Sequence, residues 1–198
     1  MNIYLDAGHH VSFGTFQLHG DDLTSAMRLA SDIGYRSFDT AQMYQNEREV
    51  GDCLRTLGLP RDELLITTKV SPRNFAVADF LPSVEQSLRD LQTDCVDMLL
   101  LHWPDQHGDN GAALDQLQKA HDLGFAAHIG ISNYTISMME DAIHRLSTRP
   151  AANQVEFNPF LDTQKLLDAA NRPALPLKSI VLLHAARWQH HHCWTTSG

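Results

Sequence analysis

The sequence of 198 residues predicts an α/β fold, a (β/α)8 TIM-type barrel of which about six to seven β/α units are present. First, apolar runs centred near residues 13, 38, 66, 99, 129 and 154 alternate with helical patterns, and their spacing of about 25–33 residues is the size of one β/α unit. Second, chemically capable polar residues follow different strands, and the carboxyl ends of barrel strands meet on one face. An open dinucleotide-binding sheet is the alternative, but residues 14–20 lack the G-x-G-x-x-G motif that it needs.

Each element follows from hydrophobic periodicity. Short apolar runs predict strands buried on both faces, and apolar residues at i, i+4 and i+7 predict the helices between them. The expected strands cover residues 11–16, 36–38, 64–68, 96–101, 127–131 and 153–157, with a candidate seventh at 175–183. The expected helices lie around residues 23–33, 50–57, 84–91, 114–117, 136–146 and 161–170. No linker interrupts the series, so we expect one domain over residues 1–198, with a divergent tail over 174–198.

Composition narrows the class of protein. Twenty-four acidic and 15 basic residues give a net charge of −9 without Lys/Arg clusters, which argues against nucleic-acid or anionic-membrane partners. Three cysteines without metal-ligand spacing favour a reducing compartment, and residues 1–16 do not resemble a signal peptide, so we expect a cytoplasmic protein. The longest apolar run, Met98–Leu101, is too short to span a bilayer. We expect a monomer, with association through open barrel edges as the alternative.

Five segments resemble the signatures of the aldo-keto reductases, in the order in which that family carries them. They are residues 34–51, 67–70, 97–104, 130–134 and 153–159. Within that family, the segments most resemble the bacterial branch that reduces diketogluconate, methylglyoxal and similar small carbonyls. The resemblance implies an NADPH-dependent oxidoreductase that reduces small aldehydes or ketones to alcohols by hydride transfer.

The resemblance also implies four catalytic residues. Tyr44 matches the general acid, although a phenol with a pKa near 10 is a reluctant donor at neutral pH. Lys69 beside the phenol would lower that pKa, and Asp39 would keep the ammonium charged and aimed. His102 would orient the substrate oxygen. Each residue alone has a structural alternative: Asp39 suits a turn cap, Tyr44 a surface tyrosine, Lys69 a solvated charge and His102 a core histidine. Their combination at strand ends favours the catalytic interpretation.

The resemblance assigns cofactor contacts to four polar residues: Thr15, Ser132, Asn133 and Gln154. Amide and hydroxyl groups suit a nicotinamide carboxamide, which both donates and accepts hydrogen bonds. The alternative for Ser132-Asn133 is a helix cap. Trp103 and Phe75 follow strand ends and either wall the substrate pocket or pack in the core.

No metal site is expected. Three histidines, His190–His192, precede Cys193, and His9 precedes His10, but adjacent side chains point in different directions on a strand or helix. A barrel hydrolase that uses His102 and Asp39 would need a nucleophile or a metal that the sequence does not offer.

The resemblance weakens after about residue 173. Ile180 stands where the family places an aromatic residue that stacks on the nicotinamide, and Lys178-Ser179 resembles the family's phosphate contacts one unit too early. We expect a C-terminal truncation or frameshift as the cause. The alternative function is therefore a catalytically inactive barrel fragment, unstable or completed by a partner chain.

Overall fold

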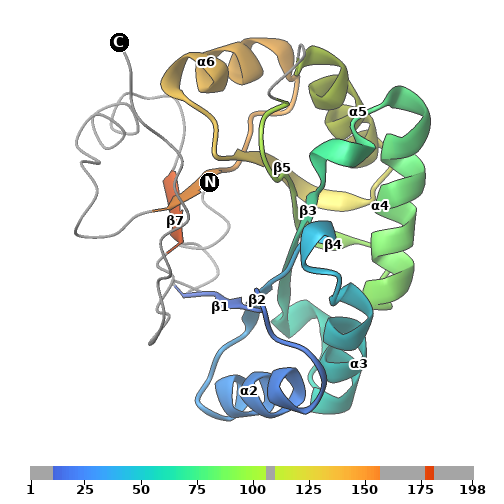
Figure 1. Ribbon diagram of the computed structural model, residues 1–198, viewed down its shortest axis with the longest axis vertical. Coiled ribbons are helices and arrows are strands. Elements are labelled where there is room, and N and C mark those ends of the chain that lie inside the picture. The colour runs from blue at the N-terminus through green and yellow to red at the C-terminus, as the bar shows by residue number, and fades with distance from the viewer. Residues whose placement is uncertain (1–10, 106–109, 157–176, 181–198) are drawn as a thin grey trace.

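The computed structural model describes residues 11–105, 110–156 and 177–180 (Figure 1). The helix expected at 161–170, most of the divergent tail and both histidine runs lie outside these ranges.

Seven parallel strands form one sheet in chain order. They are β1 (Phe13–Gly14), β2 (Ser37–Asp39), β3 (Leu65–Val70), β4 (Val96–Leu101), β5 (Ala126–Ser132), β6 (Asn153–Glu156) and β7 (Leu177–Ile180). An open doubly wound sheet reverses its strand order at a switch point, whereas the order of these seven strands does not reverse. The sheet curls, with its helices outside the curve (Figure 1). The predicted barrel class is confirmed, and β7 confirms the candidate seventh strand.

Helices connect successive strands from β1 to β6. The α-helices are α2 (Gly20–Asp32), α3 (Glu47–Leu57), α4 (Val77–Leu91), α5 (Gly111–Asp122) and α6 (Ile136–Arg145), and the 3-10 turns are η1 (Gln42–Tyr44), η2 (Arg61–Glu63) and η3 (Pro72–Asn74). Helix α3 begins at Glu47, three residues before the expected Val50. The apolar pattern does not predict this first turn, because the turn is acidic. A helix N-terminus favours such negative charge.

The core lies between the sheet and its helices. Leu99 and Leu101 of β4 belong to this core cluster, while Met98 and Leu100, on the opposite face of the same strand, are also buried. This double burial explains why the β4 sequence is apolar except at Asp97. Gly51 of α3 lies against the backbone of α4, so close that a Cβ atom at Gly51 would overlap the carbonyl of Asp90.

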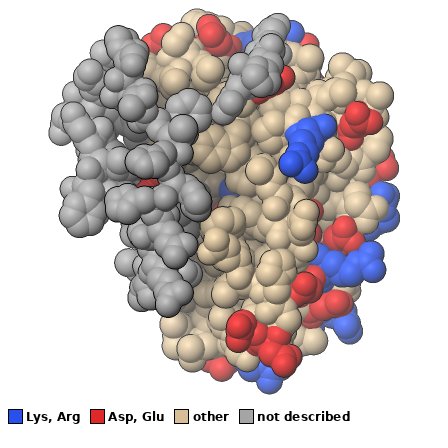
Figure 2. Space-filling view, viewed as in Figure 1, with Lys and Arg blue, Asp and Glu red and all other residues tan. Residues whose placement is uncertain are grey.

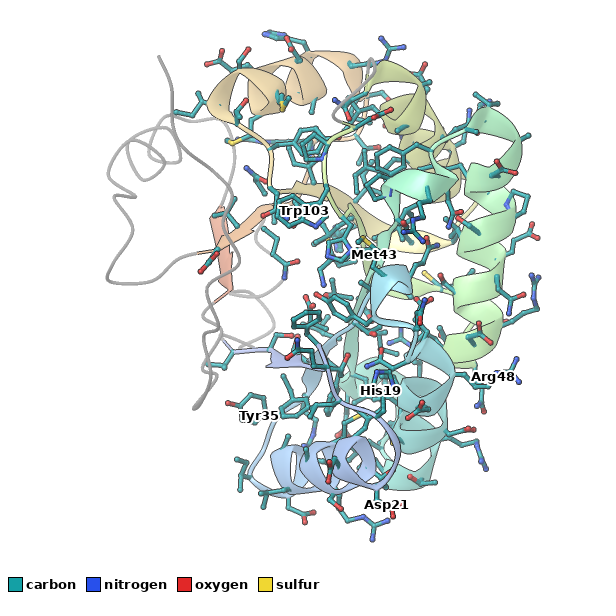
Figure 3. All side chains as sticks on the ribbon, viewed as in Figure 1. His19, Asp21, Tyr35, Met43, Arg48 and Trp103 are labelled. Atoms are coloured by element: carbon teal, nitrogen blue, oxygen red, sulfur yellow. The ribbon has the colours of Figure 1, made fainter. Side chains whose placement is uncertain are left out.

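Charged side chains gather over the helices at the margin of the molecule, and the middle of the face in Figure 2 carries little charge. Figure 3 shows the same division: Asp21 and Arg48 lie at the outer margin, whereas Met43 and Trp103 lie over the inside of the curved sheet. Over the described ranges, no helix has the length and apolar character needed to cross a membrane.

Candidate active site

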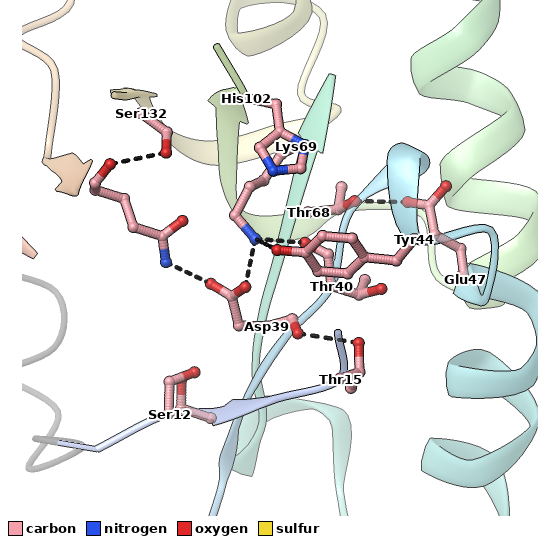
Figure 4. Close-up of polar contacts among 12 residues, drawn as sticks. Ser12, Thr15, Asp39, Thr40, Tyr44, Glu47, Thr68, Lys69, His102 and Ser132 are labelled. Carbon is pink, nitrogen blue, oxygen red and sulfur yellow. Dashed lines mark hydrogen bonds and ion pairs between the residues drawn. The ribbon is translucent and has the colours of Figure 1, made fainter. Parts of the chain in front are cut away.

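Lys69 of β3 is the centre of the site and is fully buried. Alternation along β3 turns Lys69 towards the inside of the curve and its neighbour Thr68 towards the helices. The Lys69 ammonium donates to Asp39 Oδ1, to the carbonyl oxygen of Thr40 at 2.9 Å and to the Tyr44 hydroxyl at 3.3 Å (Figure 4). Its three N–H donors therefore each have an acceptor.

Asp39, at the end of β2, is the counter-ion of Lys69 and is 6% exposed. Its second carboxylate oxygen accepts a 2.7 Å hydrogen bond from Nε2 of Gln154 on β6. The carboxylate thus joins two strands that are far apart in the sequence. The residues that cap η1 and α3 are Ala41 and Asn46, so Asp39 is not the cap of either helix.

The electrostatics of the pair follow from this burial. Desolvation alone would lower the pKa of Lys69, but the Asp39 carboxylate and the Tyr44 phenol outweigh it, so the Lys69 pKa lies above its ordinary value. The ammonium therefore stays charged over the physiological pH range.

Tyr44 ends η1 and lies half-buried beside the ammonium. Lys69 Nζ lies 4.9 Å from the centre of the Tyr44 ring, and the Phe16 ring centre lies 5.0 Å from it. The imidazole of His102 stands edge-on to the phenol, with ring centres 5.4 Å apart. Phenol, ammonium and imidazole thus share one small volume at the carboxyl ends of β2, β3 and β4.

His102 follows β4 and is 7% exposed. Burial, aided by the positive charge of Lys69 and opposed by Asp39, lowers the pKa of His102 to about 4. The imidazole is therefore neutral at pH 7 and has one N–H to donate. Its Nδ1 atom is buried and has no hydrogen-bond partner among the described residues.

The four expected cofactor residues lie in or directly after three strands, β1, β5 and β6. Ser132 donates to the Gln154 carbonyl at 2.8 Å, and Asn133 donates to the carbonyl of His102 at 3.0 Å. The hydroxyl of Thr15 donates to the Asp39 carbonyl at 3.1 Å, which ties β1 to β2. The cap of α6 is Thr135, whose hydroxyl accepts from the Met138 amide, so Ser132-Asn133 is not the cap.

The polar groups of this site suit a cofactor that carries a carboxamide. Oε1 of Gln154 is buried without a hydrogen-bond partner among the described residues, although its Nε2 is bonded to Asp39. Leaving a buried acceptor unsatisfied costs about 1–3 kcal/mol. A carboxamide N–H would satisfy it, so the residues present fit a nicotinamide.

The two aromatic residues considered for the substrate pocket, Trp103 and Phe75, lie in different environments. Trp103 is 43% exposed and its ring stacks on His102, with ring centres 6.4 Å apart. Phe75 is 7% exposed, and its ring lies 6.3 Å from that of Phe80 within the core cluster. The structure therefore favours packing for Phe75, since its ring lies against Phe80 of α4 in the core cluster, and leaves Trp103 at the open side.

Sequence reasoning missed three polar residues beside Tyr44. Asn46 is buried and donates to the carbonyls of Thr15 at 2.8 Å and Leu18 at 3.0 Å. Gln42 and Glu47 bond to β3, its following loop and α4. The available signal was the run of polar residues around this one tyrosine.

Among the described residues, no group of three His, Cys, Asp or Glu side chains lies close enough together to hold a metal ion. The fold and this site define the class: a parallel α/β barrel protein with a buried lysine–aspartate pair, a tyrosine and a neutral histidine at its strand ends.

Comparison with known proteins gives the family. The model of the Aldo/keto reductase family matches residues 10–186. The methylglyoxal reductase DkgB of Yersinia pestis is 38% identical over 173 residues, which cover 86% of this chain and 65% of the relative. The glyoxal reductase of Bacillus subtilis is 36% identical over 169 residues, or 84% and 60% of the two chains. An aldo-keto reductase from a deep-sea metagenome library superposes with a TM-score of 0.81 at 28% identity, over 86% of this chain and 62% of that one.

The chain belongs to the aldo/keto reductase family. It spans about 65% of the length of the methylglyoxal reductase that it matches.

Proposed function

We propose that this protein reduces small aldehydes and ketones to alcohols with NADPH as the hydride donor. The observation that carries the proposal is the buried Lys69 ammonium, held between the Asp39 carboxylate and the Tyr44 hydroxyl. The named relatives that reduce methylglyoxal or glyoxal support small carbonyls as the substrate class.

Tyr44 donates the proton. A carbonyl oxygen that gains a hydride at its carbon becomes an alkoxide, and a positioned acid that protonates it contributes about 10²–10⁴-fold to the rate. When the Tyr44 hydroxyl gives up its proton, the phenolate left behind faces Lys69 Nζ at 3.3 Å. The ammonium stabilises that phenolate, because two opposite charges in a buried site attract strongly.

His102 orients the carbonyl. Its imidazole is neutral and has one N–H, and its buried Nδ1 has no hydrogen-bond partner among the described residues. The imidazole stands next to the Tyr44 phenol, so both side chains border the same volume. A neutral donor aligns the substrate oxygen without competing with Tyr44 for the role of acid. Trp103, stacked on His102, lies at the open side of the site, where it can contact the substrate.

Gln154, Asn133 and Ser132 would hold the carboxamide of a nicotinamide cofactor. Gln154 offers the unsatisfied Oε1 acceptor and is itself oriented by its bond to Asp39. The nicotinamide, when bound, supplies the hydride. Through Asp39, cofactor-side and acid-side residues are parts of one hydrogen-bonded unit.

The test is NADPH oxidation with methylglyoxal, followed by absorbance, for the chain and for Tyr44→Phe. We expect turnover that falls by about 10²–10⁴-fold in the variant, while NADPH binding followed by fluorescence is retained. Turnover that Tyr44→Phe leaves unchanged would exclude the phenol as the acid. Failure of the folded chain to bind NADPH would favour the inactive-fragment alternative.

A further inference from the structure

The turn that carries Tyr44 has an unusual backbone. Gln45, directly after Tyr44, has φ 57° and ψ 27°, in the left-handed region. For a residue with a Cβ atom this conformation costs about 1–2 kcal/mol, and it persists where surrounding contacts dictate it. The contacts must come from the neighbours, because the Gln45 side chain is exposed.

Glu47, the first residue of α3, supplies such contacts from the far side of the turn. Its side chain is buried, and its two oxygens accept from the Thr68 hydroxyl at 2.5 Å and the Ser87 hydroxyl at 3.0 Å. Burial raises the pKa of Glu47, against the lowering effect of these two hydrogen bonds. Asp90 raises it further, while Lys69 lowers it.

These bonds connect the general acid to the lysine through the back of the strand. Thr68 directly precedes Lys69 on β3, so a bond to Thr68 fixes the backbone from which Lys69 projects on the opposite face. Glu47 is three residues after Tyr44. The path from Tyr44 to Glu47, Thr68 and Lys69 therefore closes a ring around the 3.3 Å contact between phenol and ammonium.

Gln42 closes the same ring from the other side of Tyr44. Its Nε2 donates to the Ser87 hydroxyl at 3.1 Å, and its Oε1 accepts from the Ser71 amide at 2.8 Å, just after β3. Ser87 of α4 thus contacts both flanks of the tyrosine turn, Gln42 before it and Glu47 after it.

We propose that Glu47 is a positioning residue which, through Thr68 and Ser87, sets the separation of the Tyr44 hydroxyl and the Lys69 ammonium. The inference rests on the proposed function, in which that separation governs proton donation. Glu47 touches neither substrate nor cofactor in this role; it acts through the turn and the strand that it joins.

The main test variant is Thr68→Val, which removes the donor to Glu47 with nearly the same shape and no change in charge. The readout is ionisation of the Tyr44 phenol, measured by ultraviolet absorbance as the difference between each protein and the same protein with Tyr44→Phe. The titratable groups around the phenol are Lys69, Asp39 and His102, and the Thr68→Val substitution leaves all three in place. Thr56→Val is the control, because the Thr56 hydroxyl donates to the Cys53 carbonyl within α3 and bonds to no other group in the described part of the chain.

We expect Tyr44 in Thr68→Val to ionise at higher pH than in the parent. Lengthening the 3.3 Å contact by roughly 1 Å weakens the attraction enough to move the midpoint by about 0.9 pH unit, at an effective dielectric constant of 20. Thr56→Val leaves the midpoint unchanged. Glu47→Gln, which keeps an acceptor for Thr68, shifts it less than Glu47→Ala.

The outcomes separate the two ideas. A lowered melting temperature in Thr68→Val with an unchanged Tyr44 midpoint overturns the positioning role and leaves the proposed function intact. A parent whose Tyr44 ionises like a free tyrosine overturns the tuning of the acid by Lys69, and the positioning role with it. A shift in Thr68→Val but not in Thr56→Val supports the inference even if the chain does not turn over.

Discussion

Asp39→Asn tests whether the ion pair is as buried as the geometry requires. The substitution keeps the size and shape of the side chain but removes the charge opposite Lys69, which is fully buried. The new amide oxygen can still accept from Lys69, and Gln154 can turn its amide to offer Oε1, which otherwise has no partner among the described residues. The loss is therefore mainly electrostatic.

The expected cost is about 3–5 kcal/mol of unfolding free energy, the range for leaving one charge of a buried pair uncompensated. Natural proteins have about 5–15 kcal/mol in total, so the variant sits near the limit of folding. For a chain of this size the change corresponds to a fall in melting temperature of about 6–20 °C. The double variant Asp39→Asn/Lys69→Met removes both charges and should recover most of the loss.

The assay is urea unfolding at several pH values, followed by circular dichroism. In the parent the Lys69 pKa lies above its ordinary value of 10.5, so its contribution is fully present below pH 10.5 and is lost as pH rises through the raised value. In Asp39→Asn burial lowers the Lys69 pKa instead, so the variant gains stability as pH rises towards 10.5. The gap between the two proteins thus narrows at high pH.

A cost below about 1 kcal/mol, the value for an exposed pair, would refute the reasoning. A double variant no more stable than Asp39→Asn would also contradict it, because the uncompensated charge would then not be the cause.

Three further predictions concern the same region. Nuclear magnetic resonance of His102, assigned by comparison with His102→Gln, should give an imidazole pKa of about 4. Because this pKa lies below the unfolded value of 6.5, the free energy of unfolding falls as the pH drops from 6.5 to about 4. A measured pKa near 6.5 would contradict the burial of the ring. Gln45→Val should lower the melting temperature by strain in the left-handed region, whereas Gln45→Gly should not, and equal effects would show that the backbone is not strained there. Gly51→Ala should cost about 1–3 kcal/mol by forcing α4 away from α3, while Gly14→Ala, whose Cβ would meet no atom within 4 Å, should cost less in the same unfolding assay.

The sequence predicted the central strands well because they are short and buried on both faces, as β3 and β5 illustrate beside β4. β4 was placed at its observed bounds, Val96–Leu101, since no polar residue interrupts the packing on either side except Asp97 at its beginning. Asp39, Lys69 and His102 could be grouped because parallel strands end on a common edge. Their assembly around Tyr44 matched the motif-based expectation, while their catalytic roles stay predictions.

Other features depend on contacts that sequence patterns do not carry. The bond from Gln154 to Asp39 joins residues 115 positions apart, so no local signal predicts it. Phe75 follows a strand in the same way as Trp103, but its ring turns to Phe80 while Trp103 turns outward. Glu47 is the first residue of α3, and its side chain points inward because Thr68 and Ser87 offer hydroxyl donors there.

The most direct test of the central claim uses NADPH that carries deuterium at both C4 positions of the nicotinamide, incubated with the chain and methylglyoxal. We predict that mass spectrometry finds one deuterium on the carbon of the newly formed alcohol, and that Tyr44→Phe greatly slows its appearance. An alcohol without deuterium, or no alcohol from a folded chain that binds NADPH, would contradict the account.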